Sequence, residues 1–159
     1  DDVVGVETCA AIKNIFSMAI GASQGLCHSS ASKEIREKNY LNAAATLMQE
    51  SIYEMIIFTE KLKGKKETVM GLAGIGDLYV SACGGRNSKM GEYLGQGINF
   101  NEAKKTKMLN DTIEGADLVL EIGSKVKSDF DIKKLPLMIS IIDAICDGKP
   151  LDVKWKYFK

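Results

Sequence analysis

The chain has 159 residues, of which 45% are hydrophobic and 26% are charged, a composition typical of a globular domain with a buried core rather than of a disordered chain. Lys plus Arg and Asp plus Glu both number 21, and this balance argues against nucleic-acid binding and against an electrostatic membrane anchor. We find no apolar run of membrane-spanning length and no basic leader, so we expect a cytoplasmic protein without a membrane span or signal peptide.

The first half of the chain predicts two long helices. Val3-Val4 resembles the end of a strand, and apolar residues then recur at spacings of three and four over 7–25, which favours a helix. The polar stretch 29–39 predicts a surface excursion or a short exposed helix, and 42–62 predicts the longest helix.

The second half predicts shorter helices that are bounded by Gly, Asn or Pro. We expect them from about Glu67 and over 87–95, 99–107, 112–127 and 136–146. Asn99 or Asn101 is expected to cap one of them, and Leu120 to face the core from another. With no alternating strand pattern after the first residues, the predicted class is all-α, with residues 1–159 forming one compact domain.

The cysteines and the lone histidine give no metal pattern. Cys9, Cys27, Cys83 and Cys146 form no Cys-x-x-Cys pair, and no second histidine accompanies His28. We therefore expect reduced, mostly buried thiols, a structural or exposed histidine, and no metal site.

Lys13 is the first candidate for chemistry. It lies in CAAIKNIF, on the same helical stripe as the apolar Cys9 and Phe16. One interpretation places it at the edge of that stripe, with its ammonium reaching water. The other is a lysine held in a cleft as a proton donor or acceptor, with Asn14 and Ser17 supplying hydrogen bonds. The pattern alone leaves both open.

Asp77 is the natural partner for that lysine. It follows Gly-Ile-Gly and precedes an apolar triplet, and Ser81 lies one helical turn further on. A simple helix-capping role explains an aspartate after glycine equally well.

The stretch Gly84-Gly85-Arg86-Asn87 suits a small phosphate. Glycines expose backbone N–H groups, a following helix adds the positive end of its dipole, and a guanidinium adds a forked charge. The alternative is a glycine turn with a solvated arginine.

Three weaker signals are discounted. GLAGIG lacks the spacing of a dinucleotide fingerprint. Glu50 and Glu54 share a helix face, which we interpret as solvated rather than as paired catalytic carboxylates. The lysine-rich segments are expected to be exposed.

The sequence resembles a known family in three motifs, in matching order along nearly the whole chain. GVETCAAIKNIFSMAIGASQGL, ETVMGLAGIGDLYVSACGGRNSKMGEYLGQG and TIEG are similar to hallmarks of the C-terminal domain of NAD(P)-dependent glycerol-3-phosphate dehydrogenase. The resemblance implies an all-helical fold like the C-terminal domain of 6-phosphogluconate dehydrogenase. The segment 27–42 is longer than in the bacterial pattern.

The resemblance implies roles for single residues. Lys13 matches the general acid/base at the C2 oxygen of the substrate, and Asp77 matches the aspartate that contacts this lysine and the substrate. Positions implied near the glycerol phosphate are Asn14, Ser81, Gly85, Arg86 and Asn87. Positions implied near the nicotinamide cofactor are Arg86, Thr112 and Glu114.

The resemblance also implies a larger enzyme. NAD or NADP would bind mainly to a preceding dinucleotide-binding domain that this chain lacks, so the chain alone is expected to be inactive. The substrate pair would be glycerol 3-phosphate and dihydroxyacetone phosphate, a precursor step of glycerophospholipid synthesis, in a homodimer. The alternative is a helical dimerisation module without catalysis. The Gly-Gly-Arg-Asn element separates the chain from 3-hydroxyacyl-CoA and ketopantoate dehydrogenases, whose substrates place no small phosphate there.

Overall fold

The protein is all-helical, as predicted. The computed structural model describes residues 1–27 and 33–158, and side chains for 1–27 and 40–158. Within these residues there are eight α-helices, three short 3-10 or π segments and no strand. His28 and part of the polar stretch 29–39 lie outside the described residues.

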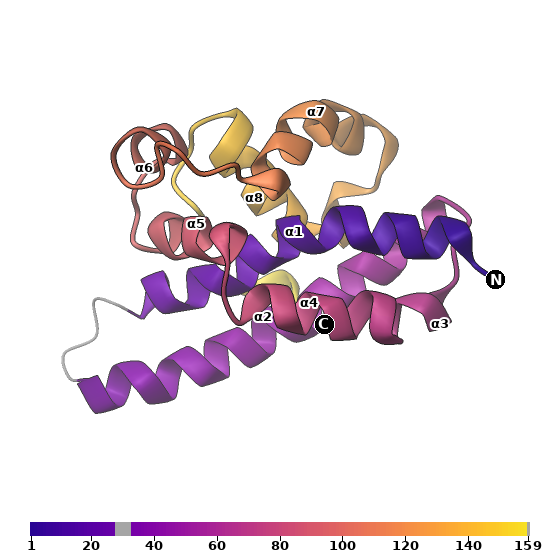
Figure 1. Ribbon diagram of the computed structural model, residues 1–159, viewed down its shortest axis with the longest axis horizontal. Coiled ribbons are helices and arrows are strands. Elements are labelled where there is room, and N and C mark those ends of the chain that lie inside the picture. Colours follow the sequence, from indigo (N-terminus) through magenta and orange to yellow (C-terminus); the bar gives the residue numbers. More distant parts are fainter. Residues whose placement is uncertain (28–32, 159) are drawn as a thin grey trace.

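Helix α1 (Val3–Leu26) is the central element. In Figure 1 it crosses the middle of the molecule, between α2, α3 and α4 on one side and α5 to α8 on the other. Within the described residues it is the one helix long and apolar enough to cross a membrane, but other helices pack around it and just over half of its apolar window is buried. We therefore describe it as the core helix. The predicted strand end at Val3-Val4 is wrong, because the Asp2 carboxylate accepts the Gly5 N–H at 3.0 Å and starts the helix there.

Helix α2 (Lys33–Lys61) lies beside α1 and is longer than predicted. The helix begins nine residues before the expected position 42. Its first turns are rich in Lys, Glu and Arg, which are good helix formers.

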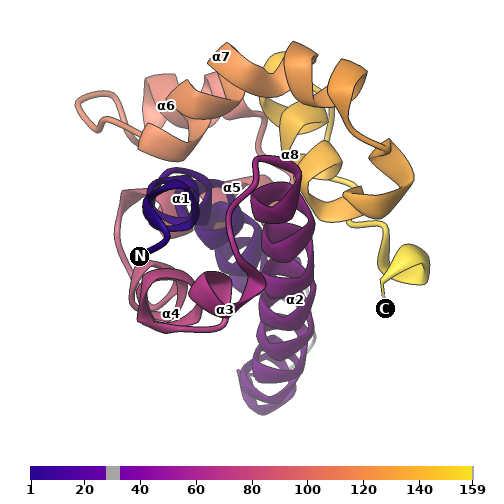
Figure 2. The same ribbon diagram turned by 90° about the vertical axis from the view of Figure 1, so that its right-hand side faces the viewer.

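Three short segments follow and pack beneath α1, as Figure 2 shows for α3 and α4. They are α3 (Lys66–Val69), a π-helical turn (Leu72–Gly76) and α4 (Asp77–Ala82). The short helix predicted near Glu67 is α3.

Helix α5 (Arg86–Gly95) makes the closest packing with α1. A Cβ added at Gly91 would lie 1.8 Å from the Met18 carbonyl oxygen, so only glycine permits this approach. Helix α6 (Phe100–Thr106) follows, and the side chain of Asn99 caps it by accepting the Asn101 N–H at 2.9 Å.

The last two helices, α7 (Glu114–Asp129) and α8 (Pro136–Cys146), pack on each other and on α1. Short 3-10 turns follow each of them, at Ile132–Lys134 and Trp155–Tyr157. Helix α8 has the predicted bounds, whereas α7 starts two residues later than predicted. Leu120 is exposed, so its predicted inward position is wrong.

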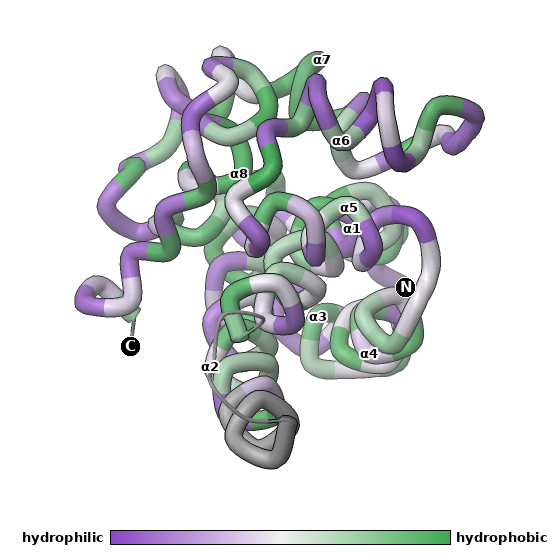
Figure 3. The backbone as a smooth tube through the Cα atoms, turned by 90° about the vertical axis from the view of Figure 1, so that its left-hand side faces the viewer, coloured by the Kyte–Doolittle hydropathy of each residue, from purple (hydrophilic) through white to green (hydrophobic). Residues whose placement is uncertain are grey.

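Not all apolar and sulfur-containing side chains are covered. Figure 3 shows hydrophobic colour on α4 at the outer edge of the molecule near the N-terminus. Exposed apolar side chains there include Leu72 and Val80. The four thiols are free, but only Cys9 is buried, so the prediction of mostly buried thiols is wrong.

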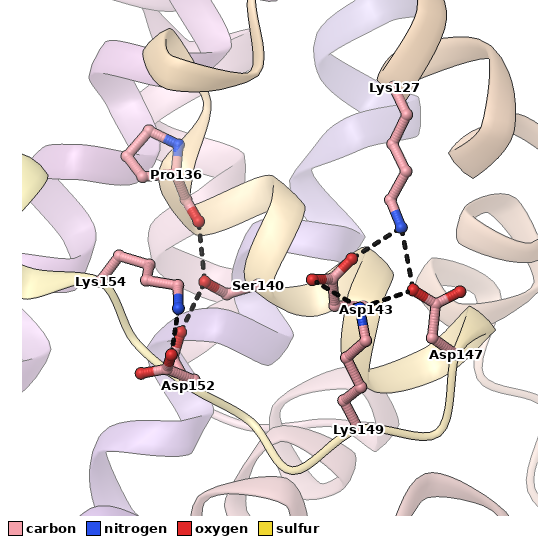
Figure 4. Close-up of polar contacts among 8 residues, drawn as sticks. All are labelled: Lys127, Pro136, Ser140, Asp143, Asp147, Lys149, Asp152 and Lys154. Carbon is pink, nitrogen blue, oxygen red and sulfur yellow. Dashed lines mark hydrogen bonds and ion pairs between the residues drawn. The ribbon is translucent and has the colours of Figure 1, made fainter.

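A charge network joins the ends of α7 and α8 (Figure 4). Lys127 contacts Asp143 at 2.7 Å and Asp147 at 3.1 Å, and Lys149 contacts both aspartates from the far side. The hydroxyl oxygen of the buried Ser140 lies 2.8 Å from the Pro136 carbonyl oxygen and 2.7 Å from that of Asp152, and its single hydrogen is shared between these two acceptors. These contacts fasten the C-terminal segment to α8.

Glu54 corrects another prediction. Its side chain is fully buried, and Glu50 is buried one turn before it, so the expected solvated face is wrong. The Glu54 carboxylate accepts the backbone N–H groups of Leu137 at 2.6 Å and Met138 at 2.8 Å, at the start of α8. Burial raises the pKa of Glu54 to about 8, with a further contribution from Glu50, while the two N–H donors act in the opposite direction.

Candidate functional site

Lys13 and Asp77 form an ion pair between α1 and α4. The Lys13 Nζ lies 2.6 Å from the Asp77 Oδ2. The lysine side chain is 19% exposed and the aspartate 40% exposed, so the pair is partly shielded from solvent. Lys13 therefore does not simply reach water, and the predicted proximity of the two groups is present.

The backbone before Asp77 explains its position. Leu72–Gly76 forms a π-helical turn, a rare geometry that is frequent at functional sites. A Cβ at Gly74 would lie 2.0 Å from the Val69 carbonyl oxygen, so glycine lets this turn fold tightly on α3. Asp77 then begins α4, and Ser81 lies one turn further along this helix, partly exposed.

A second cluster joins the first turns of α5 and α7. The Arg86 Nη2 donates to the Glu114 Oε1. The Asn87 Nδ2 donates to the Glu114 Oε2 at 3.2 Å, and the Asn87 Oδ1 accepts the Gly115 N–H at 2.8 Å. Ile113, at the N-cap position of α7, makes no side-chain capping bond. The buried Asn87 takes over this role from the neighbouring helix α5.

The two clusters meet at α1. Gly115 packs against the backbone of Asn14, where a Cβ would lie 2.5 Å from the Asn14 carbonyl oxygen. A continuous series of contacts therefore runs from Asp77 through Lys13 and its neighbour Asn14 to Gly115 and the second cluster. The structure brings together segments that are far apart in the sequence.

The turn before Arg86 is open. Gly84 and Gly85 are exposed, and no heavy atom lies within 4 Å of a Cβ built on either residue. Gly85 has φ +97°, which favours glycine, and it precedes the first turn of α5 without a side-chain cap. Thr112 is also exposed, two residues before α7 begins.

A shallow apolar groove of about 500 Å³ adjoins the ion pair. Asp77 lines it together with Val6, Ala10, Leu72 and Val80. Leu72 is 85% exposed, which is unusual for a leucine with apolar neighbours. Asp77 thus presents its carboxylate beside an uncovered apolar face.

Two features of the cluster have no clear signal in the sequence. Glu114 is paired within the protein, although the sequence suggested only a contact with cofactor. Gly115 supplies a buried N–H and a close approach to α1. The glycine of TIEG was the one available sign, and nothing in the sequence links it to Asn87 or Asn14. Among the side chains that the structure describes, those of residues 1–27 and 40–158, no group of His, Cys, Asp and Glu is arranged to hold a metal ion.

Comparison with known proteins identifies the family. Residues 2–155 match the family model described as the C-terminus of NAD-dependent glycerol-3-phosphate dehydrogenase. The chain belongs to this family. The glycerol-3-phosphate dehydrogenase [NAD(P)+] of Clostridium tetani is 34% identical over 148 residues, 91% of this chain and 37% of that protein. The NADP(+)-dependent glycerol-3-phosphate dehydrogenase of Archaeoglobus fulgidus is 34% identical over 133 residues, 80% of this chain and 38% of that protein.

A solved structure supports the same family. The crystal structure of glycerol-3-phosphate dehydrogenase from Coxiella burnetii superposes with a TM-score of 0.75 and 30% identity, over 94% of this chain and 42% of that one. The chain therefore spans about two fifths of the length of these relatives. The relatives named above are dehydrogenases that use NAD(P)+ or NADP+.

Proposed function

We propose that this chain is the substrate-binding and catalytic half of a glycerol-3-phosphate dehydrogenase. The enzyme would interconvert sn-glycerol 3-phosphate and dihydroxyacetone phosphate, a step that supplies glycerophospholipid precursors. The observation that carries the proposal is the ion pair of Lys13 and Asp77, linked through Asn14 to the cluster that holds Arg86. Family membership supports the proposed reaction and cofactor type.

Lys13 is proposed to handle the proton at the C2 oxygen. In the reducing direction its ammonium donates a proton to the carbonyl oxygen of dihydroxyacetone phosphate, and in the oxidising direction its amine takes the hydroxyl proton back. Asp77, 2.6 Å away, holds the ammonium in one place. Ser81 and Asn14 would complete the polar lining of this part of the site.

Arg86 is proposed to hold the phosphate group. The exposed turn at Gly84-Gly85 leaves room for a tetrahedral anion in front of the first turn of α5. Asn87 has one amide hydrogen left for the substrate, because its Nδ2 and Oδ1 each already bond to α7. Fixing the phosphate would fix the distance from C2 to Lys13.

The cofactor would bind mainly outside this chain. The described residues form no strand, and so no strand, glycine turn and helix of the kind that cradles a dinucleotide. Arg86, Thr112 and Glu114 would add contacts to the cofactor from this chain, since all three are at least partly exposed. Nicotinamide, when bound, supplies or accepts the hydride.

We also propose that the apolar groove beside Asp77 is covered by a preceding dinucleotide-binding domain. Covering Val6, Leu72 and Val80 would bury apolar surface and remove water from the Lys13–Asp77 pair. The proposal includes a homodimeric, cytoplasmic enzyme.

The test is turnover in a longer protein that carries both domains. Lys13→Ala is expected to lower the rate at saturating substrate by about 10²- to 10⁴-fold, the usual contribution of a general acid. Lys66→Ala, which removes an exposed lysine of α3, is the matched control and is expected to leave the rate unchanged. Near-normal turnover of the Lys13 variant would reject the proposed role of Lys13, whereas no turnover by the two-domain wild type would favour a dimerisation module without catalysis. The 159-residue chain alone is expected not to oxidise NADH.

A further inference from the structure

The guanidinium of Arg86 already has a carboxylate partner. Glu114 contacts Arg86 through its Oε1 and Asn87 through its Oε2, so both carboxylate oxygens are engaged. The guanidinium that would bind the substrate phosphate is therefore already paired with an anion of the protein itself.

The two halves of this arrangement differ in burial. The side chains of Arg86 and Glu114 are 51% and 43% exposed, whereas Asn87 is 9% exposed and bonds to the buried N–H of Gly115. An ion pair at that level of exposure is weak and readily exchanged. The bond from Asn87 to Gly115 is protected from water and holds the start of α7 in place. Ligand exchange at Arg86 can thus occur without moving α7.

We propose that Glu114 is an internal ligand of Arg86 that an incoming phosphate group must displace, so that Glu114 lowers phosphate affinity. The inference rests on the proposed phosphate site at Arg86. A guanidinium presents the same forked donors to carboxylate and to phosphate, so the two anions compete for it. The bond from Asn87 keeps the Glu114 carboxylate close after it leaves Arg86. Its negative charge then repels a phosphate dianion at short range.

The test is a titration of the 159-residue chain with inorganic phosphate, followed by NMR at constant ionic strength. Glu114→Gln removes the charge but keeps an oxygen that can accept from Asn87. This variant is expected to bind phosphate about three- to tenfold more tightly than the wild type. Glu121→Gln removes the same charge from an exposed position on the same helix and is expected to change the affinity less than about twofold. Arg86→Ala is expected to abolish the binding.

The outcomes separate the two proposals. Unchanged or weaker binding by Glu114→Gln, with binding still dependent on Arg86, overturns the inference and leaves the phosphate site in place. Binding that survives Arg86→Ala, or no binding by either wild type or Glu114→Gln, rejects the phosphate site and the inference that rests on it. Wild-type spectra give a second readout that needs no Glu114 variant. Phosphate should shift the Glu114 side-chain carboxyl signal together with the Arg86 Nε signal, and an unmoved Glu114 signal contradicts displacement.

Discussion

Glu54→Gln should give a loss of stability that shrinks as the pH rises. Glu54 is fully buried and accepts two N–H groups at the start of α8. The amide keeps one acceptor oxygen but turns its NH₂ group toward the other N–H. At pH 5, where Glu54 is neutral, leaving that buried donor unpaired costs about 1–3 kcal/mol.

The pH dependence follows from the sign of the pKa change. The pKa of Glu54 rises from 4.5 to about 8 on folding, so the folded protein binds the proton more tightly than the unfolded chain. This stabilisation is fully present below about pH 4.5 and is lost as the pH rises through 8. At about 1.4 kcal/mol for each unit of pKa, the loss has an upper limit of about 5 kcal/mol. Glutamine does not titrate, so its disadvantage should shrink or reverse by pH 9.

Urea unfolding followed by circular dichroism at pH 5, 7 and 9 measures this difference. Glu60→Gln removes an exposed carboxylate from the same helix and is the matched control, with an expected effect below about 0.5 kcal/mol at each pH. A Glu54→Gln penalty that is independent of pH, or that grows with pH, would refute the reasoning.

Two further predictions concern packing and charge. Gly91→Ala should destabilise the protein by about 1–3 kcal/mol, because the added Cβ would meet the Met18 carbonyl. Thermal or urea unfolding measures this loss. A variant as stable as the wild type would show that α1 and α5 can move apart without cost. Gly84→Ala is its control and should be nearly neutral, since its Cβ meets nothing within 4 Å. Asp143→Asn should lower the free energy of unfolding by less than about 1 kcal/mol, because the ion pairs of Asp143 with Lys127 and Lys149 are partly exposed. A loss that is undiminished in about 1 M salt would contradict this reasoning.

Local signals predicted the helices whose ends are marked by Pro, Gly or a capping Asn. Pro136 in a first turn and the Gly-Lys-Pro stretch after it fixed both ends of α8, and Asn99 marked the start of α6. The start of α2 was missed because its first residues are mostly polar and lack the apolar repeat from which the helix was predicted. The start of α1 was missed because Val3-Val4 suits a strand locally, and the Asp2 cap decides otherwise.

The site was less predictable because its contacts join distant segments. Spacing suggested Asp77 as a partner for Lys13 but left each residue with two interpretations, and the family resemblance favoured the functional one. Glu54 seemed solvated because its partners are the N–H groups of α8, 83 and 84 residues away, which no helical periodicity reveals. The pairing of Arg86 with Glu114 was hidden for the same reason, since it depends on how α5 and α7 cross α1.

A double-mutant cycle on turnover tests most directly whether Lys13 and Asp77 act as one catalytic unit. The longer, two-domain protein would carry Lys13→Ala, Asp77→Ala and both changes together, each assayed at saturating substrate. We predict that the double variant is about as slow as Lys13→Ala alone, because the aspartate acts through the lysine that it holds at 2.6 Å. Losses that multiply would show that the two side chains work independently and would contradict the account.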